Sequence, residues 1–457
     1  MSYGFNPVEL SNFARYYGFH YDNLNPLALV KDILTDMERG LAGADSSLPM
    51  IPSYITPAVM FQPGEKALAL DAGGTNLRAG LVYFDKNCKA TAEGTFKSPM
   101  PGTAGRVSAG QFFDMLAAAA APLITAESNI KGIGFTFSYP MEIQSDADGI
   151  LLGFSKELDI PDVVGKAIGA GLRDALARQG CKYSGPIALL NDTTATLLSG
   201  LAAIPSGGET VQANKAYGFS GGQVIGFILG TGINTAYPET SIPKIGFESQ
   251  SSPQIVVCET GTFNFRDRGP LDREFDSATK NPGAYTLEKA VSGAYLGPLC
   301  LHILKQAIKD NAVCFKKSDE LLSMARLETR VLNEFLHAPL TGGNPVGSLF
   351  AHEEGDALAA VQYLVSIITE RAALLSAAVL AATVQRINCG PQAAFRPCSP
   401  VRIAVEGTTY MIFKGMRRSL ESWLHFMLAD GKPQPYIIAP VEQASLFGAA
   451  VAALCRD

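Results

Sequence analysis

The sequence predicts an α/β fold, and three observations support this prediction. An apolar strand over 67–70 leads directly into a glycine-rich turn and a second strand, within ALALDAGGTNLRAGLV. The same plan of strand, glycine turn and strand returns in VIGFILGTGINTAY, which starts at Val224. Long helical patterns lie between and after these segments. Strands that alternate with helices are typical of α/β proteins.

The elements follow in order along the first half of the chain. Apolar residues at helical spacing predict a helix over 27–41. Strands bounded by turn residues are predicted over 67–70, 77–84, 130–137 and 186–190. Helices are predicted over 108–121, 161–179 and 194–201.

The second half repeats part of this plan. Strands are predicted over 224–229 and 234–237, joined by a turn at Gly230-Thr231-Gly232. With the first glycine turn this makes a weak internal repeat. Asn214–Gln223 is predicted to be a surface loop. Long helical patterns cover 285–309, 318–337 and 356–387.

Composition narrows the class of protein. The 457 residues suit two or three domains, with 47% hydrophobic and 18% charged residues. The formal net charge is −6 and no basic run is present, so a nucleic-acid partner is not expected. The most apolar stretches, 115–126 and 374–384, are shorter than the roughly 20 residues that span a bilayer, so no membrane partner is expected either.

The eight cysteines are scattered and form no C-x-x-C pair. This argues against a disulfide framework or a zinc site and predicts a reducing, cytoplasmic location. The five histidines lie near none of the motifs below, and His352-Glu353 lacks the second histidine of H-E-x-x-H. A metalloprotease or a histidine-based hydrolase therefore has no support.

The first glycine turn, Asp71-Ala72-Gly73-Gly74-Thr75-Asn76, suits phosphate. Adjacent glycines let backbone N–H groups approach phosphate oxygens, and an Asp at the strand end can hold a hydrated Mg²⁺. The same residues also suit a plain tight turn, and the turn alone leaves both interpretations open. It is not a P-loop, since no G-x-x-x-x-G-K-[ST] exists.

Three further carboxylates are candidates for chemistry. Asp192, after the apolar strand 186–190, is placed to accept a hydroxyl proton in phosphoryl transfer, although taken alone it suits the N-cap of the next helix better. Glu259 and Glu288 have the chemistry to bind neighbouring sugar hydroxyls. Each taken alone is more typical of a solvated surface residue.

Together these motifs resemble the hexokinase family, from about residue 60 to the C-terminus. The resemblance rests on ordered segments: LALDAGGTNLRAGLV, GFTFSYP, FSKELDIPDVVG, LLNDTTATLLSG, GFILGTGINTAY, NPGAYTLEKAVSGAYLGPL, TERAALLSAAVLAATV and AVEGTTYMIFKGM. It implies ATP-dependent phosphorylation of the 6-hydroxyl of a hexose, glucose before fructose, mannose or an amino sugar. A catalytically silent hexose sensor of the same fold is the alternative. An ATPase-switch protein of the same superfamily is a third class, opposed by the sugar-binding segment Gly134–Pro140 and both glutamates.

The resemblance assigns roles residue by residue. Asp192 would be the general base, and Lys156 would reach the transferred phosphoryl group. The sugar would be bound by Ser138, Ser155, Lys156, Asn191, Asp192, Asn234, Glu259 and Glu288. ATP and Mg²⁺ would be bound by Asp71 (to the metal through water), Gly73, Gly74, Thr75, Asn76, Arg78, Gly230, Thr231, Gly232, Gly407, Thr408 and Ser445.

The resemblance also implies a two-lobed, actin-like (ribonuclease H-like) fold with the site in the cleft between lobes. The small lobe would comprise 61–192 and 441–457, and the large lobe 1–60 and 193–440. A monomer or a homodimer is expected.

The chain departs from the family pattern at several points. Ser155-Lys156-Glu157-Leu158 replaces Thr-Lys-Gly-Phe, Thr260 replaces an aromatic residue, and Ala284-Tyr285 replaces Gln-Gln. These departures surround the sugar and leave the choice of hexose open. The late Gly-Ser-Gly-Lys/Arg-Gly-Ala-Ala motif of the family appears here as QASLFGAA from Gln443, which leaves adenosine recognition open.

Overall fold

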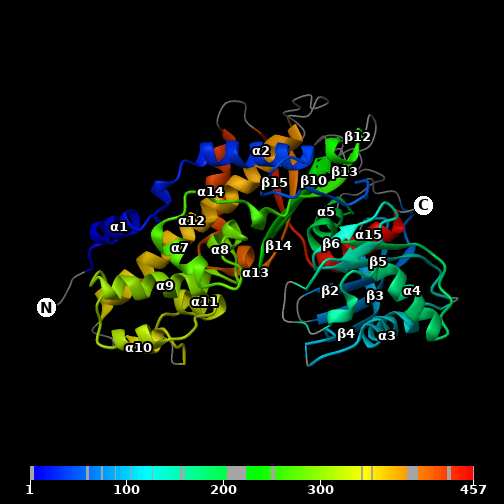
Figure 1. Ribbon diagram of the computed structural model, residues 1–457, viewed down its shortest axis with the longest axis horizontal. Coiled ribbons are helices and arrows are strands. Elements are labelled where there is room, and N and C mark those ends of the chain that lie inside the picture. Colours follow the sequence, from blue (N-terminus) through cyan, green and yellow to red (C-terminus); the bar gives the residue numbers. More distant parts are fainter. Residues whose placement is uncertain are drawn as a thin grey trace.

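The computed structural model confirms the α/β fold, with two mixed sheets and helices around and between them (Figure 1). It describes residues 5–57, 61–73, 76–87, 89–103, 105–125, 127–154, 158, 160–202, 223–248, 253–340, 343–350, 354–388, 400–429 and 434–455. Nine residues of the loop predicted at 214–223, and the site residues Gly74, Thr75, Ser155 and Lys156, lie outside these ranges.

The first sheet has five strands in the order β4-β3-β2-β5-β8. These strands are β2 (Lys66–Gly73), β3 (Asn76–Phe84), β4 (Ala90–Pro99), β5 (Ile130–Phe137) and β8 (Ile187–Leu190). β2 pairs with β3 as an antiparallel hairpin, whereas β2, β5 and β8 run parallel. β2 is buried on both faces, which explains its almost unbroken apolar sequence.

Helices α3 (Ala109–Ala120) and α4 (Ile168–Arg178) cover one face of this sheet. A capping box between Ser108 and Gln111 starts α3. The short hairpin of β6 (Met141–Ile143) and β7 (Gly149–Leu151) lies beside them. The helix predicted over 161–179 is wrong in its first turns. A 3₁₀ turn at Pro161–Val163 is separated from α4 by Gly165, whose φ of 81° breaks the helix.

The second sheet has six strands in the order β1-β13-β10-β9-β14-β15. They are β1 (Ile51–Pro52), β9 (Val224–Leu229), β10 (Ile233–Glu239), β13 (Gln254–Val257), β14 (Val401–Glu406) and β15 (Tyr436–Pro440). β9 and β10 form an antiparallel hairpin, and β9, β14 and β15 run parallel. The two-stranded pair β11 (Ser241–Ile242) and β12 (Phe247–Glu248) follows β10.

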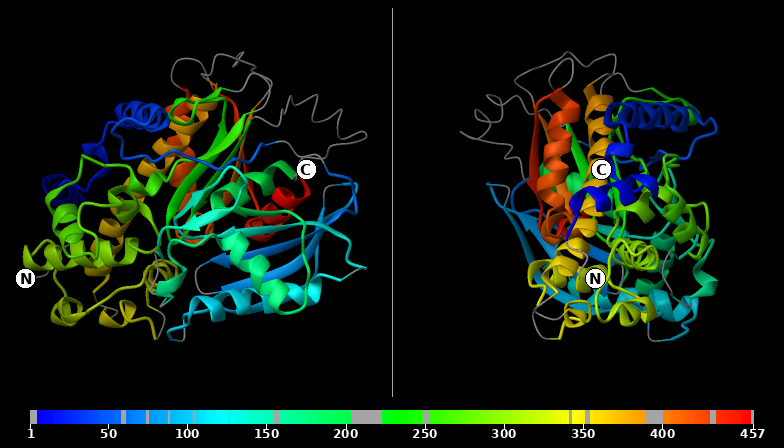
Figure 2. Two further views of the ribbon diagram at one scale, coloured as in Figure 1. Left: turned by 45° about the vertical axis from the view of Figure 1, so that its right-hand side comes forward. Right: turned by 90° about the vertical axis from the view of Figure 1, so that its left-hand side faces the viewer.

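Two helices, α5 (Asp192–Ala202) and α15 (Ala444–Leu454), form the layer between the sheets (Figures 1 and 2). α15 packs on β2 and β5, α5 packs on β9 and β14, and the helices pack on each other. Glycine permits this close approach. A Cβ at Gly134 would lie 1.8 Å from the Ala449 carbonyl oxygen, and one at Gly448 would lie 2.0 Å from that of Ala195.

A helical region packs on the other face of the six-stranded sheet around one large apolar core. Its helices are α1 (Pro7–Tyr16), α2 (Pro26–Ala42), α7 (Pro270–Ser277), α8 (Thr286–Val291), α9 (Leu296–Lys309), α10 (Ser318–Ser323), α11 (Thr329–His337), α12 (Gly355–Asn388), α13 (Thr408–Ile412) and α14 (Met416–Ala429). Within the described chain, only α12 is long and apolar enough to cross a bilayer, and 89% of its apolar window is buried in the protein.

Two predicted helices are each two helices. The pattern over 285–309 breaks between α8 and α9, where Gly293 packs so tightly that a Cβ would lie 2.4 Å from the Thr409 hydroxyl oxygen. The pattern over 318–337 divides into α10 and α11. The predicted lobe boundaries stay predictions.

Candidate active site

Three parallel strands of the five-stranded sheet end side by side. Asp71 lies near the end of β2, Ser138 follows β5, and Asn191 follows β8. The Ser138 N–H donates to the Ala72 carbonyl at 3.2 Å. A Cβ at Gly73 would lie 2.8 Å from the Ser138 hydroxyl oxygen, so the first glycine turn lies against the segment predicted to bind sugar. Carboxyl ends of parallel strands are where α/β proteins bind ligands.

The β2–β3 hairpin presents an ion pair beside its turn. Asp71 and Arg78 are cross-strand partners, and Gly73 pairs with Asn76 at the turn. The Arg78 Nη1 lies 3.9 Å from Asp71 Oδ2, and the Asp71 carboxylate is largely buried whereas Arg78 is half exposed. The pair therefore places one charge of each sign next to the first glycine turn.

The helix α5 begins at Asp192, and its cap is the residue before it. Asn191 Oδ1 accepts the Thr193 N–H at 2.7 Å, and the Asn191 carbonyl accepts the Ala195 N–H at 3.0 Å. The N-cap interpretation of Asp192 is therefore wrong, because Asn191 performs that role. Asp192 occupies the first turn, where the partial positive charge of the helix end favours an anion.

The second glycine turn lies at the carboxyl edge of the six-stranded sheet. Gly230, Thr231 and Gly232 connect β9 to β10, and Gly407 follows the parallel neighbour β14. Gly407 has a φ of 125°, and a Cβ there would lie 2.3 Å from the Leu229 carbonyl oxygen. The Gly230–Gly232 turn and the start of α13 at Thr408 therefore pack backbone to backbone.

Asn234 and Glu259 form a preorganised pair. Asn234 Nδ2 donates to Glu259 Oε1 at 2.8 Å, while Asn234 Oδ1 accepts the N–H groups of Thr235 and Thr260 at 2.8 and 3.2 Å. Glu259 has a left-handed backbone with φ of 56°. Such strain in a non-glycine residue is common at functional sites. Burial raises the pKa of Glu259 to about 7, with Asp192 and Glu288 also raising it and the Asn234 bond opposing.

Glu288 lies against the second glycine turn. Its Oε2 accepts the Ile233 N–H at 3.3 Å. A Cβ at Gly232 would lie 2.6 Å from this oxygen, and one at Gly261 would lie 3.0 Å from it. The predicted sugar carboxylate and the predicted phosphate turn are therefore in direct contact.

Comparison with known proteins identifies the family of this chain. Sequence models described as hexokinase match residues 10–202 and 224–455, the second of which alone covers more than half of the chain. The chain belongs to the hexokinase family. It is accordingly a hexose kinase, a phosphotransferase that acts on a hexose hydroxyl.

Hexokinase relatives match over most of the chain. Hexokinase-2 of Candida albicans is 28% identical over 94% of this chain and 88% of its own length. Hexokinase-5 of Oryza sativa is 29% identical over 94% of this chain and 86% of its own length. Human hexokinase-3 is 29% identical over 82% of this chain, which corresponds to 40% of that longer protein.

A solved hexokinase has the same fold. The hexokinase from Schistosoma mansoni complexed with glucose superposes with a TM-score of 0.75 at 23% identity, over 98% of this chain and 100% of that one. The predicted two-lobed, actin-like kinase fold is thereby confirmed.

The sequence interpretation missed one carboxylate that lies beside this candidate site. Glu406 ends β14 and lies 3.5 Å, through Oε2, from the Thr196 hydroxyl one turn after Asp192. Burial raises its pKa to about 7, and the charges of Asp192 and Asp71 add to this effect. The signal was an acid at a strand end directly before Gly407, the same pattern that pointed to Asp71 and Asp192.

The predicted residues Ser445 and Asn76 are also described. Ser445 lies in α15, where its carbonyl accepts the Thr136 hydroxyl of β5 at 2.7 Å. Asn76 begins β3 opposite Gly73. Ser445 is thus placed by the five-stranded sheet, whereas Gly407 and Thr408 belong to the edge of the six-stranded one.

The donor set fits a magnesium ion that is bound mainly by phosphates. In the described chain, no three His, Cys, Asp or Glu side chains converge to hold a metal directly. Asp71 nonetheless presents a carboxylate beside a glycine turn. Mg²⁺ keeps much of its water and is commonly bound by one or two carboxylates together with substrate phosphates. Asp71 is suited to such contact through water.

Proposed function

We propose that this protein transfers the terminal phosphoryl group of ATP, bound with Mg²⁺, to the 6-hydroxyl of glucose. The hexokinase relatives support the reaction, and the glucose complex of the Schistosoma mansoni enzyme supports the sugar. The observation that carries the proposal is the place of Asp192. It stands at the start of α5, between the two sheets, with Glu259 and Glu406 within electrostatic range.

Asp192 is proposed as the general base. A sugar hydroxyl is a weak nucleophile, and a carboxylate that hydrogen-bonds to it accepts its proton as the phosphoryl group transfers. Asn191 caps α5, so the helix start is fixed without using the Asp192 side chain as the cap. The cap therefore sets the backbone position of the proposed base at the start of α5.

Glu259, Asn234, Glu288 and Ser138 are proposed to bind the sugar. Asn234 is locked by two backbone N–H groups and in turn orients Glu259. Ionised carboxylates accept hydrogen bonds from sugar hydroxyls and so define which hydroxyl faces Asp192. Orientation of this kind contributes strongly to the rate of a two-substrate reaction.

Asp71, Arg78 and the two glycine turns are proposed to bind the nucleotide. When bound, Mg²⁺-ATP supplies the phosphoryl group and neutralises part of its charge. The backbone N–H groups of the turns suit phosphate oxygens, and Arg78 adds a cation on the side of Asp71. Closure of the proposed lobes, 61–192 with 441–457 against the rest, would exclude water that competes for the phosphoryl group.

Two departures from the family pattern bear on the choice of hexose. Thr260 is buried next to Glu259, and its hydroxyl has no hydrogen-bond partner among the described residues. Tyr285 is partly exposed, and burial together with the charges of Glu259 and Glu288 raises its pKa. The small side chain at 260 and the phenol at 285 are proposed to tune selectivity among hexoses.

The test is phosphorylation of glucose by the purified chain with ATP and Mg²⁺, alongside fructose, mannose and glucosamine. Turnover on glucose that disappears with EDTA is expected. Turnover on another sugar alone would replace glucose as the substrate. Sugar binding by calorimetry without turnover, with ATP or any other nucleoside triphosphate, would point to the hexose sensor instead.

A cytoplasmic location is proposed because the cysteines named below carry free thiols. The described cysteines Cys181, Cys258, Cys300 and Cys314 are free thiols, which is typical of proteins in a reducing compartment.

A further inference from the structure

The helix that carries Glu288 cannot be stable by itself. α8 has six residues, and isolated helices of that length do not persist in water. Its N-cap residue, Tyr285, has a left-handed backbone with φ of 55° and makes no side-chain cap bond. Tertiary contacts must therefore fix the position and rotation of α8. Thr286 supplies one, through its hydroxyl bond to the Phe263 carbonyl at 2.9 Å.

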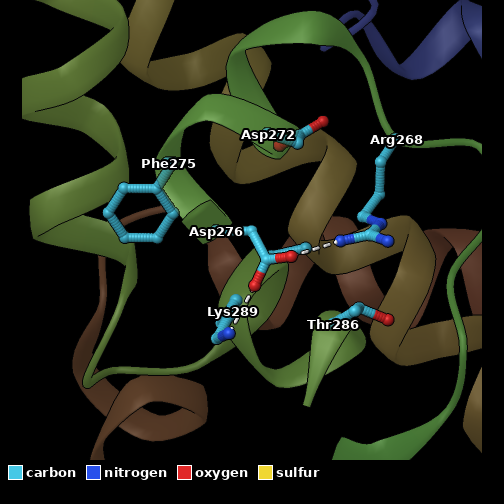
Figure 3. Close-up of a pocket in the computed structure, with 7 residues that line it drawn as sticks. Arg268, Asp272, Phe275, Asp276, Thr286 and Lys289 are labelled. Carbon is cyan, nitrogen blue, oxygen red and sulfur yellow. Dashed lines mark hydrogen bonds and ion pairs between the residues drawn. The ribbon is translucent and has the colours of Figure 1, made fainter. Parts of the chain in front are cut away.

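A buried ionic cluster supplies the stronger contact (Figure 3). Lys289, only 4% exposed, bonds through Nζ to Asp276 Oδ1 and to the Asn281 carbonyl, the latter at 2.6 Å. Asp276 Oδ2 accepts Arg268 Nη1 at 2.8 Å and the Gly283 N–H at 3.0 Å. Asp276 of α7 thus joins the chain before α7, the loop before α8, and α8 itself.

The cluster is not a ligand site. Arg268, Asp276, Thr286 and Lys289 line a cavity of about 10 Å³, which is roughly the space of one water molecule at most. Although burial works in the other direction, the hydrogen bonds from Lys289, Gly283 and Arg268 hold the pKa of Asp276 below its ordinary value. The carboxylate is therefore ionised at neutral pH, and its charge is used within the protein.

Stability alone is a weak explanation for such a cluster. Removing charged groups from water is costly, and a buried ion pair often stabilises no better than apolar residues of the same volume. An ionic cluster does fix the orientation of its side chains and of the elements that carry them, because its hydrogen bonds set angles as well as distances.

The cluster and the proposed sugar site are linked directly along the chain, because Lys289 of the cluster is the next residue after Glu288. Successive residues of a helix point about 100° apart. While Lys289 extends into the cluster, its neighbour Glu288 extends to the Ile233 N–H, between Gly232 and Gly261. Rotation of α8 about its axis would move both side chains together.

We propose that the Arg268–Asp276–Lys289 cluster is a positioning device that sets the Glu288 carboxylate for hexose binding. This inference rests on the proposed function, since it assigns to Glu288 a contact with the sugar. Lys289 and Asp276 act through Glu288 and are positioning residues.

The test compares two buried ion pairs. Lys289→Met is expected to raise KM for glucose about 10-fold or more, with kcat within about 3-fold of wild type. Lys289→Arg, which keeps the cation, should recover most of that loss. The matched control is Arg371→Met. Arg371 is fully buried and bonds Asp272 at 2.7 and 2.8 Å, joining α12 to α7. It should lower Tm comparably and leave KM for glucose within about 2-fold.

Calorimetry with 6-deoxyglucose, which lacks the 6-hydroxyl and so cannot be phosphorylated there, gives a second measurement. The Kd should follow KM in all variants. If Lys289→Met does not fold, Arg268→Gln at the outer edge of the cluster takes its place, with an expected rise in KM of about 3-fold. Unchanged sugar affinity in the folded cluster variant, or an equal rise in Arg371→Met, would overturn the positioning role. Wild-type protein that neither binds nor phosphorylates hexose would overturn the proposed function instead.

Discussion

The two glycine hairpins share one plan and differ in what holds their turns. In the β2–β3 hairpin the strand ladder continues to the Gly73–Asn76 pair, so the strands themselves hold the turn. The β9–β10 turn is held from outside. The Gly230 carbonyl accepts the Gly293 N–H and the Thr409 hydroxyl, each at 2.8 Å, and the Thr231 carbonyl accepts the Ala294 N–H at 3.0 Å.

The two hairpins therefore differ in where their stabilising contacts come from, mainly from within the hairpin in the first and from distant segments in the second. The first hairpin is held mainly by pairing between strands that are close in the sequence, with one further bond from the Ser138 N–H to the Ala72 carbonyl. The second depends on the segment after α8 and on α13, and it also contacts the Glu288 carboxylate. Changes in the first hairpin should therefore affect the nucleotide, whereas changes in the second should affect both nucleotide and sugar.

The largest effect is expected between the hairpins, at Asp192. Asp192→Asn should lower kcat by about 10²–10⁴, the usual contribution of general acid–base catalysis, while hexose binding persists. Steady-state kinetics and calorimetry measure the two quantities. Asp114→Asn, which removes an exposed carboxylate of α3 paired with Arg178, is the control and should leave both unchanged. A kcat within tenfold of wild type would remove Asp192 from the base role.

A paired glycine substitution tests the second hairpin against the first. In Gly232→Ala the new Cβ would meet the Glu288 oxygen at 2.6 Å, whereas in Gly80→Ala of β3 the nearest atom would lie at 3.5 Å. Overpacking of this kind costs about 1–3 kcal/mol, so KM should rise about 5–150-fold for hexose and for ATP in Gly232→Ala. Gly80→Ala should resemble wild type. A rise for ATP alone would show that the Glu288 contact is not used.

The pH dependence should come from Glu259, which accepts a hydrogen bond from Asn234 of the second hairpin. In the proposed sugar site, Glu259 is the stronger hydrogen-bond acceptor when it is ionised, and burial raises its pKa to about 7. kcat/KM for hexose should therefore fall about tenfold per unit as pH drops below 7. Glu259→Gln should lose this dependence along with most activity. Glu406, whose pKa is also about 7, provides the comparison, and Glu406→Gln should keep it. The reverse pattern would assign the titration to Glu406.

The smallest effect is expected for the stability of the first hairpin. Arg78 is half exposed and lies 3.9 Å from Asp71. Arg78→Gln should therefore change the free energy of unfolding by less than about 1 kcal/mol, as measured by urea denaturation. KM for ATP should rise several-fold at unchanged KM for hexose. A larger loss of stability would mean that the ion pair, and not the strand ladder, holds this turn.

The sequence was most informative where a candidate site residue directly follows a recognisable apolar strand. Asp71 and Asp192 follow apolar strands, so both their strands and their neighbourhood could be predicted. Glu406 stands in the same pattern but was passed over, because one Glu before one Gly is a weak signal. The cap of α5 was assigned one residue too late, since Asn191 and Asp192 are both good caps and only geometry distinguishes them.

The break between α8 and α9 could not be predicted from periodicity. Ser292–Tyr295 fits the helical pattern on both sides, and one glycine is tolerated in many helices. The chain breaks there because Gly293 and Ala294 donate to the distant Gly230–Gly232 turn. The buried ion pair of Lys289 could not be predicted either, because a lysine on a short helix is usually solvated and its partner Asp276 belongs to another helix.

The sandwiched position of α15 has a consequence for synthesis of the chain. One face of the five-stranded sheet is complete at β8, yet the helix that covers its other face is made about 250 residues later. During translation the apolar residues Ala67, Ala69 and Val82 stay without their native cover until residues 444–454 leave the ribosome. Contacts so distant along the chain form slowly. The nascent protein therefore carries an exposed sheet face for most of its synthesis, a surface suited to chaperones that bind apolar segments.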